Sequence, residues 1–186
     1  MKKLFYALLL ISLSNCASRS TEPKNEDKDS ILNYLKSKGI SNANVMVVKD
    51  YAEYKRLSKN DVLIIPEITF FDGNGGLIEY KNIQKECSQD AYFFIKDYYK
   101  GKQLKYNKIQ KIDMFVSSYV NLSNDSKIDF SDKSKIYVFI NWAIFTNKLN
   151  KDSFNLLSLN NNDFTYILID LDVQKKWNVS NNHNSK

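Results

Sequence analysis

The chain has 186 residues with 43% apolar side chains, 2 prolines and 5 glycines, which suits one globular domain and excludes disordered and collagen-like proteins. One histidine and two cysteines exclude most metal sites, and we expect no bound metal and no cofactor. The formal charge is +6, but only Arg19 and Arg56 among the 27 basic residues are arginines, so we expect no nucleic-acid partner.

The first segment, residues 1–15, has the pattern of a secretory signal peptide. Lys2 and Lys3 precede an apolar run over residues 4–13, which is too short for a transmembrane helix of roughly 20 residues. Leu-Ser-Asn-Cys, ending at Cys16, resembles a bacterial lipobox, in which the cysteine receives a lipid on its sulfur and becomes the first mature residue. We therefore predict lipidation of Cys16. The alternative is an ordinary signal peptide in which this cysteine has no role.

Residues 16–29 form a polar tether in this interpretation. Almost no side chain in the stretch is apolar, so it cannot contribute to a core. Lipid chains at Cys16 would anchor the protein stably to a membrane, which is the first partner we expect. The predicted location is the bacterial cell envelope, as a membrane-anchored lipoprotein, with the outer membrane favoured over the inner.

The segment 30–106 alternates predicted helices and strands. Its first helix begins at Asp29 or Ser30 and ends at Gly39, where the missing Cβ permits a left-handed cap. Three glycines within residues 72–76 predict a tight reversal between two strands. The hydrophobic patterns predict helices at 51–58 and 88–101 and strands at 45–48, 62–65, 68–71 and 77–80. The segment 107–134 is predicted as a helix over 109–119 and a linker.

The segment 135–175 is predicted as a right-handed strand–helix–strand unit. Continuous apolar runs at 136–140 and 166–169 indicate parallel strands that are covered on both faces. Residues 146–158 between them form a predicted helix, with Leu149 among the side chains turned inward.

Polar residues follow the second of these strands. Asp170 and Asp172 alternate with apolar residues at its end, close to where α/β folds place ligands. Residues 176–186 are a polar tail, and we interpret its His183 as a solvated side chain. A single histidine in a tail cannot complete a Ser-His-Asp triad.

The residues from 138 to 149, Val-Phe-Ile-Asn-Trp-Ala-Ile-Phe-Thr-Asn-Lys-Leu, resemble the strand and active-site turn of thioredoxin-like thiol-disulfide reductases of the bacterial envelope. In that family an apolar strand leads to Trp-Ala, here Trp142 and the next residue, and then to Cys-x-x-Cys at the start of a helix. Thr146 and Leu149 occupy the two cysteine positions. Thr146 is able to cap a helix, but neither side chain exchanges disulfides, so the resemblance implies the fold without its redox activity.

The remaining parts of that fold have counterparts earlier in the chain. Pro66, the hairpin and the helix after it resemble the C-terminal half of a thioredoxin, so segment 30–106 matches the second half and segment 135–175 the first. The resemblance implies an α/β fold with a mixed central sheet and flanking helices, in permuted or truncated order. Two incomplete units are the alternative. If Pro66 faces the turn at Thr146, a groove for an extended peptide remains.

Three functions are left open by these residues. The leading hypothesis is a redox-inactive thioredoxin-like domain that binds a peptide or protein partner. The second is a thiol-dependent oxidoreductase acting through Cys87 or a partner, although the charges of Glu86 and Asp90 oppose thiolate formation and favour an unreactive thiol. The third is a truncated, non-functional remnant of a reductase.

Overall fold

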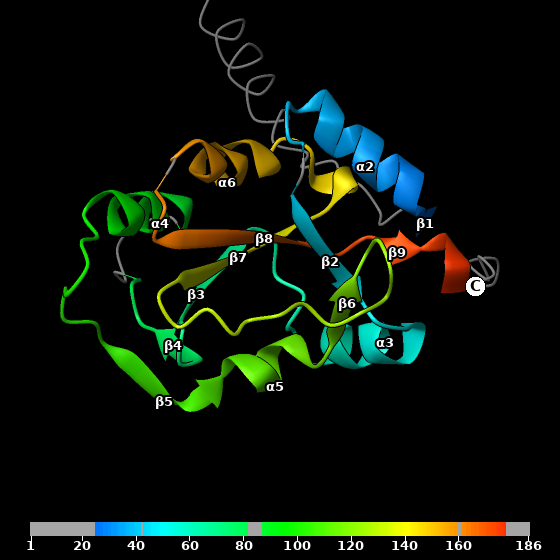
Figure 1. The fold of residues 1–186 in the computed structure, drawn as a ribbon. Helices are drawn as coiled ribbons and strands as arrows, with labels where there is room; N and C mark the ends of the chain where they lie inside the picture. The colour runs from blue at the N-terminus through cyan, green and yellow to red at the C-terminus, as the bar shows by residue number, and fades with distance from the viewer. Residues whose placement is uncertain (1–24, 42, 82–86, 160, 178–186) are drawn as a thin grey trace, which may run out of the picture.

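The computed structural model describes residues 25–41, 43–81, 87–159 and 161–177 (Figure 1). The main sheet has seven strands in the spatial order β5 (Tyr106–Lys111), β4 (Gly76–Ile78), β3 (Glu67–Asp72), β7 (Ile136–Trp142), β8 (Phe164–Asp170), β2 (Asn44–Val48) and β6 (Tyr119–Asn121). The central strands β7, β8 and β2 run parallel, and the other neighbours are antiparallel. A separate parallel pair joins β1 (Asn25–Glu26) to β9 (Val173–Gln174).

Helices cover both faces of the sheet. One face carries α2 (Lys28–Ser37), α4 (Cys87–Lys96) and α6 (Asn150–Asn155), and the other carries α3 (Tyr51–Lys59) and α5 (Ile112–Val116) (Figure 1). Three single-turn 3-10 helices complete the described elements: η1 (Ile144–Thr146), η2 (Leu156–Ser158) and η3 (Lys175–Trp177). The expected mixed α/β sheet with flanking helices is therefore confirmed.

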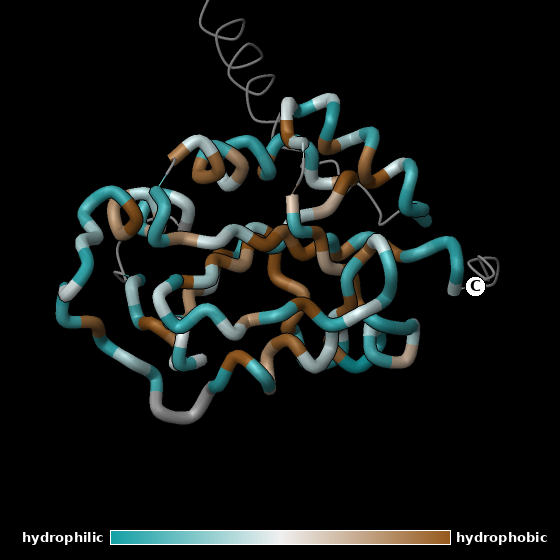
Figure 2. The backbone as a smooth tube through the Cα atoms, in the orientation of Figure 1, coloured by the Kyte–Doolittle hydropathy of each residue, from teal (hydrophilic) through white to brown (hydrophobic). Residues whose placement is uncertain are grey.

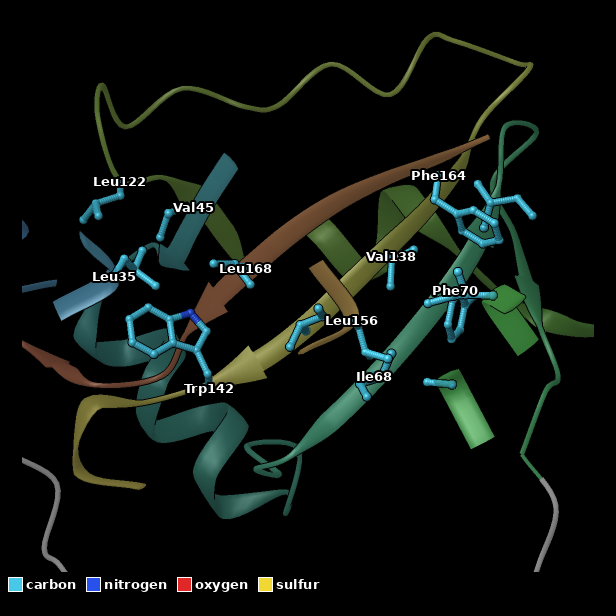
Figure 3. Close-up of a cluster of buried hydrophobic side chains, with 14 of the residues drawn as sticks. Leu35, Val45, Ile68, Phe70, Leu122, Val138, Trp142, Leu156, Phe164 and Leu168 are labelled. Carbon is cyan, nitrogen blue, oxygen red and sulfur yellow. The ribbon is translucent and has the colours of Figure 1, made fainter. Parts of the chain in front are cut away.

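The core divides into one apolar cluster on each face of the sheet. The cluster beneath α2, α4 and α6 includes Phe70, Trp142 and Leu168 (Figure 3), and the opposite cluster includes Phe71 and Phe139. Hydrophobic residues accordingly follow the central strands in Figure 2. All seven residues of β7 are buried, as expected for a strand covered on both faces. Each fully buried large apolar side chain contributes roughly 1.5–3 kcal/mol.

The start of α2 corrects the predicted boundary of the tether. Asp27 Oδ1 accepts the N–H of Ser30 at 2.9 Å, and Ser30 Oγ accepts the N–H of Asp27 at 2.9 Å, which together form a capping box. Lys175 Nζ donates to Asp27 Oδ2 at 2.7 Å, and these bonds lower the pKa of Asp27 to about 2. The helix therefore begins at Lys28, earlier than predicted, and residues 25–29 belong to the fold.

The predicted hairpin is confirmed as the antiparallel pair β3 and β4. Asp72 Oδ1 closes the turn by accepting the N–H of Asn74 at 3.0 Å and that of Gly76 at 2.8 Å. Gly75 adopts a left-handed φ of 79°, and a Cβ at this position would lie 2.8 Å from Ile112 Cγ2. Both constraints require glycine at residue 75.

The prediction of one helix over residues 109–119 is wrong. These residues span the end of β5, the short helix α5 and the first residue of β6. β5 pairs with β4 and β6 pairs with β2, so contacts between distant segments override the helical spacing of Ile112 and Val116. The segment 107–134 is therefore no simple helix and linker, because it crosses one face of the sheet and contributes to both of its edges (Figure 1).

The predicted strand over residues 62–65 is also wrong. Ile64 N–H donates to the carbonyl of Val62 at 3.0 Å, which makes a tight turn in place of extended strand pairing. Val62 is 42% exposed and Ile64 is 52% exposed. β3 begins only after Pro66.

The polar tail begins later than predicted. Trp177, the last residue of η3, packs against Tyr54 at a ring distance of 5.5 Å and against Tyr51 at 6.1 Å. Lys176 Nζ donates to Asp125 Oδ1 at 2.6 Å. Residues 176 and 177 are consequently part of the domain, while His183 lies outside the described residues.

Candidate functional site

The candidate site lies where β7 ends and β3 begins. Asn141, next to the last residue of β7, pairs in register with Glu67, the first residue of β3. Pro66 directly precedes Glu67, and the peptide bond before it is cis. Asn141 Nδ2 also donates to the carbonyl of Ile64 at 3.2 Å. The structure thus brings the loop at Pro66 to the end of the strand that carries Trp142.

Trp142 is a core residue at this end of the sheet. Its side chain is fully buried beneath α2 and α6 (Figure 3). The indole stacks on Tyr34 at 5.5 Å with an interplanar angle of 10°, and it meets Phe154 at 5.4 Å. Among the described residues, Trp142 Nε1 has no hydrogen-bond partner. Trp142 therefore anchors the strand and both helices, with no accessible surface for a ligand.

The turn after β7 is closed by hydrogen bonds within the chain. Thr146 Oγ1 lies 2.9 Å from both the carbonyl oxygen of Ala143 and Asn150 Oδ1. Asn150 Nδ2 donates to Ala143 O at 2.8 Å and to the Tyr34 hydroxyl at 3.0 Å. The Tyr34 hydroxyl in turn donates to Asn147 Oδ1 at 2.9 Å. These bonded atoms hold the conformation of the turn.

Two predictions about Thr146 and Leu149, the residues that the resemblance aligns with cysteines, are wrong. Thr146 ends η1 and does not cap the following helix, because α6 begins only at Asn150. Leu149 is 53% exposed, because it lies just before the first residue of α6. Neither side chain carries a thiol, so neither position can take part in disulfide exchange.

Two buried carboxyl groups lie behind the turn. Asp172 Oδ2 accepts the N–H of Ile144 at 2.6 Å, and Asp170 Oδ2 accepts from Gln174 Nε2 at 3.1 Å. Burial raises the pKa of Asp170 well above its usual value, and the negative charge of Asp172 raises it further. Burial also raises the pKa of Asp172. The pair therefore holds a proton under conditions in which exposed aspartates have lost theirs.

From the sequence, Asp170 and Asp172 were predicted only to lie at the end of a strand, close to where α/β folds place ligands. Their alternation with apolar residues was the available signal, but it could not show that both side chains turn into the protein. Asp170 and Asp172 are almost completely buried, so a ligand in solvent cannot reach them. They act on the turn, which Asp172 fixes through Ile144.

An open pocket of about 530 Å³ lies beside the loop that precedes Pro66, where this loop meets β3 and β4. Val62 and Ile64 are the exposed residues of its apolar lining, which also includes Leu77 and Phe115. Glu67 and Lys81, which form an ion pair, lie at the same pocket. Its volume is within the range of sites that bind small molecules or a few side chains of a partner. The exposure of Val62 and Ile64 was not predicted from the sequence, because both residues were assigned to a strand.

Three predicted site residues lie wholly or partly outside the described part of the chain. Cys16 and His183 lie outside the described residues. Cys87 is the first residue of α4, but its side chain lies outside the described part of the chain. Lipidation of Cys16 and the state of the Cys87 thiol stay predictions.

Comparison with protein-family models, curated proteins and solved structures finds no match to this chain. Within the described ranges, no helix is long and apolar enough to cross a bilayer. Over the same residues, no cluster of three or more histidine, cysteine or acidic side chains is arranged to hold a metal ion. Fold and site define an α/β protein with a seven-stranded mixed sheet, a turn closed by internal hydrogen bonds and an open, partly apolar pocket.

Proposed function

We propose that this chain is a lipid-anchored lipoprotein of the bacterial cell envelope whose thioredoxin-like domain has no redox activity and binds a peptide or protein partner. One observation carries the proposal. A fully buried central strand ends at Trp142 and leads into a turn with Thr146 and Leu149 at the positions of the two cysteines. Without thiols this turn cannot exchange disulfides, whereas the neighbouring pocket remains available for binding.

The arrangement of elements supports the thioredoxin-like part of the proposal. β7 lies between β8, which follows it along the chain, and β3, which begins after Pro66. β4 completes the hairpin, and α4 and α6 cover the same face of the sheet (Figure 1). These are the parts that the family resemblance implies. Because β3, β4 and α4 precede β7 in the chain but share its sheet, the arrangement favours one permuted domain over two incomplete units.

The pocket beside Pro66 supports binding of an extended segment. Val62 and Ile64 are apolar side chains that are about half exposed, and covering the exposed half contributes roughly 0.7–1.5 kcal/mol each. Glu67 and Lys81 add one charge of each sign, which suits polar groups of a partner backbone or side chains.

Selection of binding peptides tests this function directly. The purified chain is exposed to a library of displayed peptides, and the affinity of a selected peptide is measured by fluorescence polarisation. Val62→Asp and Ile64→Asp are expected to weaken binding by about tenfold or more. The matched control is Leu32→Asp, which changes an exposed apolar residue of α2, a helix that contributes no residue to the pocket lining. Equal loss in control and pocket variants, or failure to select any peptide, would contradict the proposal.

Two further assays separate the proposal from an enzymatic role and from an unanchored protein. In an insulin-reduction assay we expect no activity above background, both in the natural chain and in Cys87→Ser. Activity that disappears in Cys87→Ser would establish the thiol-dependent alternative. Cys16→Ser is expected to leave the membrane fraction and to lose incorporation of labelled lipid, and unchanged partitioning would refute lipidation.

The remnant hypothesis predicts an imperfect core, which the two apolar clusters on the sheet argue against. We expect the purified chain to unfold in one cooperative thermal transition. A gradual loss of structure without a transition would favour the remnant.

A further inference from the structure

A second pocket, of about 400 Å³, lies between the end of α2 and α6, and the proposed peptide-binding function does not use it. We call it the lysine pocket, because three of its seven lining residues are lysines and none is acidic. Its lining residues are Lys38, Asn147, Lys148, Asn150, Lys151, Phe154 and Asn155.

The charge in the lysine pocket is not neutralised by the described part of the chain. Lys38, Lys148 and Lys151 are all exposed, and none forms an ion pair with a described acidic residue. Three positive charges around one cavity repel each other, and an anion between them would remove that repulsion. Lys148 and Lys151 also flank the beginning of α6, where the helix dipole disfavours cations, so their charges do not stabilise the helix.

Amide groups add hydrogen-bond donors to these charges. The Tyr34 hydroxyl donates to Asn147 Oδ1, which leaves the Asn147 NH₂ group without a partner among the described residues. Asn155 also lines the pocket, and its side chain has no hydrogen-bond partner among the same residues, so its amide is a second available donor group. The lining holds no arginine, so its positive charge comes from separate ammonium groups, which bind phosphate as point charges. Separate ammonium and amide donors suit a phosphate group, whose several oxygens accept bonds from different directions.

The size and the apolar wall of the pocket indicate what carries the phosphate. A volume of about 400 Å³ exceeds that needed for an inorganic anion and falls within the range of small-ligand sites. Phe154 supplies an apolar surface and contacts the buried Trp142. We infer that the lysine pocket binds a phosphate group carried by a small organic molecule or by a phospholipid headgroup.

Calorimetric titration of the purified full chain with glycerol 3-phosphate tests this inference. We expect saturable binding that Lys38→Gln/Lys148→Gln/Lys151→Gln weakens by about tenfold or more. The matched control Lys59→Gln/Lys100→Gln/Lys127→Gln removes the same charge from exposed lysines outside the pocket, and its affinity is expected to stay within about twofold. The single variants Lys148→Gln and Lys151→Gln are titrated in the same way, because one substitution disturbs the fold less than three do.

Vesicle sedimentation distinguishes the two sources of phosphate. Vesicles of phosphatidylcholine with phosphatidylglycerol are compared with vesicles of phosphatidylcholine alone. Preference for phosphatidylglycerol that is lost in the pocket variant and kept in the control assigns the site to a lipid headgroup. Binding of glycerol 3-phosphate without such a preference assigns it to a soluble ligand. No binding in either experiment, or an equal loss in both triple variants, overturns the inference, whatever the result for peptide binding.

Discussion

Two loops meet at the end of β7, and they use their side chains in opposite ways. The turn over residues 143–149 is closed by hydrogen bonds to side chains from other elements. The loop over residues 61–66 leaves Val62 and Ile64 exposed at the wall of a pocket. A group that is already bonded within the fold is not available to a ligand. The bonded atoms of the first loop, such as Asn147 Oδ1 and the Ile144 N–H, therefore support the fold, whereas the exposed apolar side chains of the second loop remain available to the proposed partner.

The largest expected effect is the loss of stability when the support for the closed turn is removed. Trp142→Ala is expected to lower the free energy of unfolding by about 3–5 kcal/mol, because it empties a fully buried site between Tyr34 and Phe154. Denaturant unfolding measures the change. Trp177→Ala, at a partly exposed site, should cost clearly less, and equal losses would contradict the central role of Trp142.

The buried acid pair gives the second-largest effect, and it depends on pH. The pKa of Asp170 is raised in the folded state, so its contribution to stability is complete below about pH 4, where unfolded aspartate is protonated. As the pH rises, the unfolded chain releases its proton first, and the free energy of unfolding falls until the folded pKa is passed. Asp170→Asn should therefore be more stable than the natural chain at neutral pH, by about 1–3 kcal/mol.

Unfolding measured from pH 4 to pH 8 checks this prediction. The advantage of Asp170→Asn should shrink toward pH 4, where the natural side chain is also uncharged. Asp97→Asn makes the same change of carboxylate to amide on an exposed side chain and is the matched control. An advantage that is the same at every pH would show that the substitution acts through packing alone.

A smaller effect is expected from the hydroxyl that closes the turn. Tyr34→Phe removes the bonds to Asn147 and Asn150 but keeps the ring on Trp142, so we expect a loss of about 0.5–1.5 kcal/mol. Tyr51→Phe is the control, since its hydroxyl has no hydrogen-bond partner among the described residues. If both variants lose the same stability, the hydroxyl network does not hold the turn.

The smallest effect on stability is expected at the open loop. Ile64→Ser should change the free energy of unfolding by no more than about 0.5 kcal/mol, because the side chain is already half exposed. Ile68→Ser, only four residues later on β3, is fully buried and should be severely destabilising. Thermal unfolding of both variants tests whether the loop is free for binding, and a large loss in Ile64→Ser would show that it belongs to the core.

Elements with a strong local pattern were predictable. The apolar runs at 136–140 and 166–169 became the neighbouring parallel strands β7 and β8, because a strand covered on both faces needs apolar residues at every position. The hairpin was predictable from its glycines, of which Gly75 takes a left-handed conformation. Pro66, which the resemblance relates to the turn after Trp142, directly precedes a strand that pairs with β7.

Features that depend on distant partners were not predictable. The helical spacing of residues 109–119 is local, whereas β5 and β6 exist only through pairing with β4 and β2. Leu149 looked like a core residue, but the late start of α6 leaves it at the surface. The exposure of Ile64 and the burial of Asp170 likewise follow from what packs around them.

The sequence by itself determined the central apolar strands, the hairpin and the absence of cysteine at positions 146 and 149, since each of these depends only on nearby residues. Only the tertiary structure decided which side chains meet. It joined Lys38 to Lys148 and Lys151 in one pocket and turned two aspartates into the protein behind the turn. The physical reason is that burial and electrostatic environment are properties of the packed chain, and residues far apart in the sequence create them together.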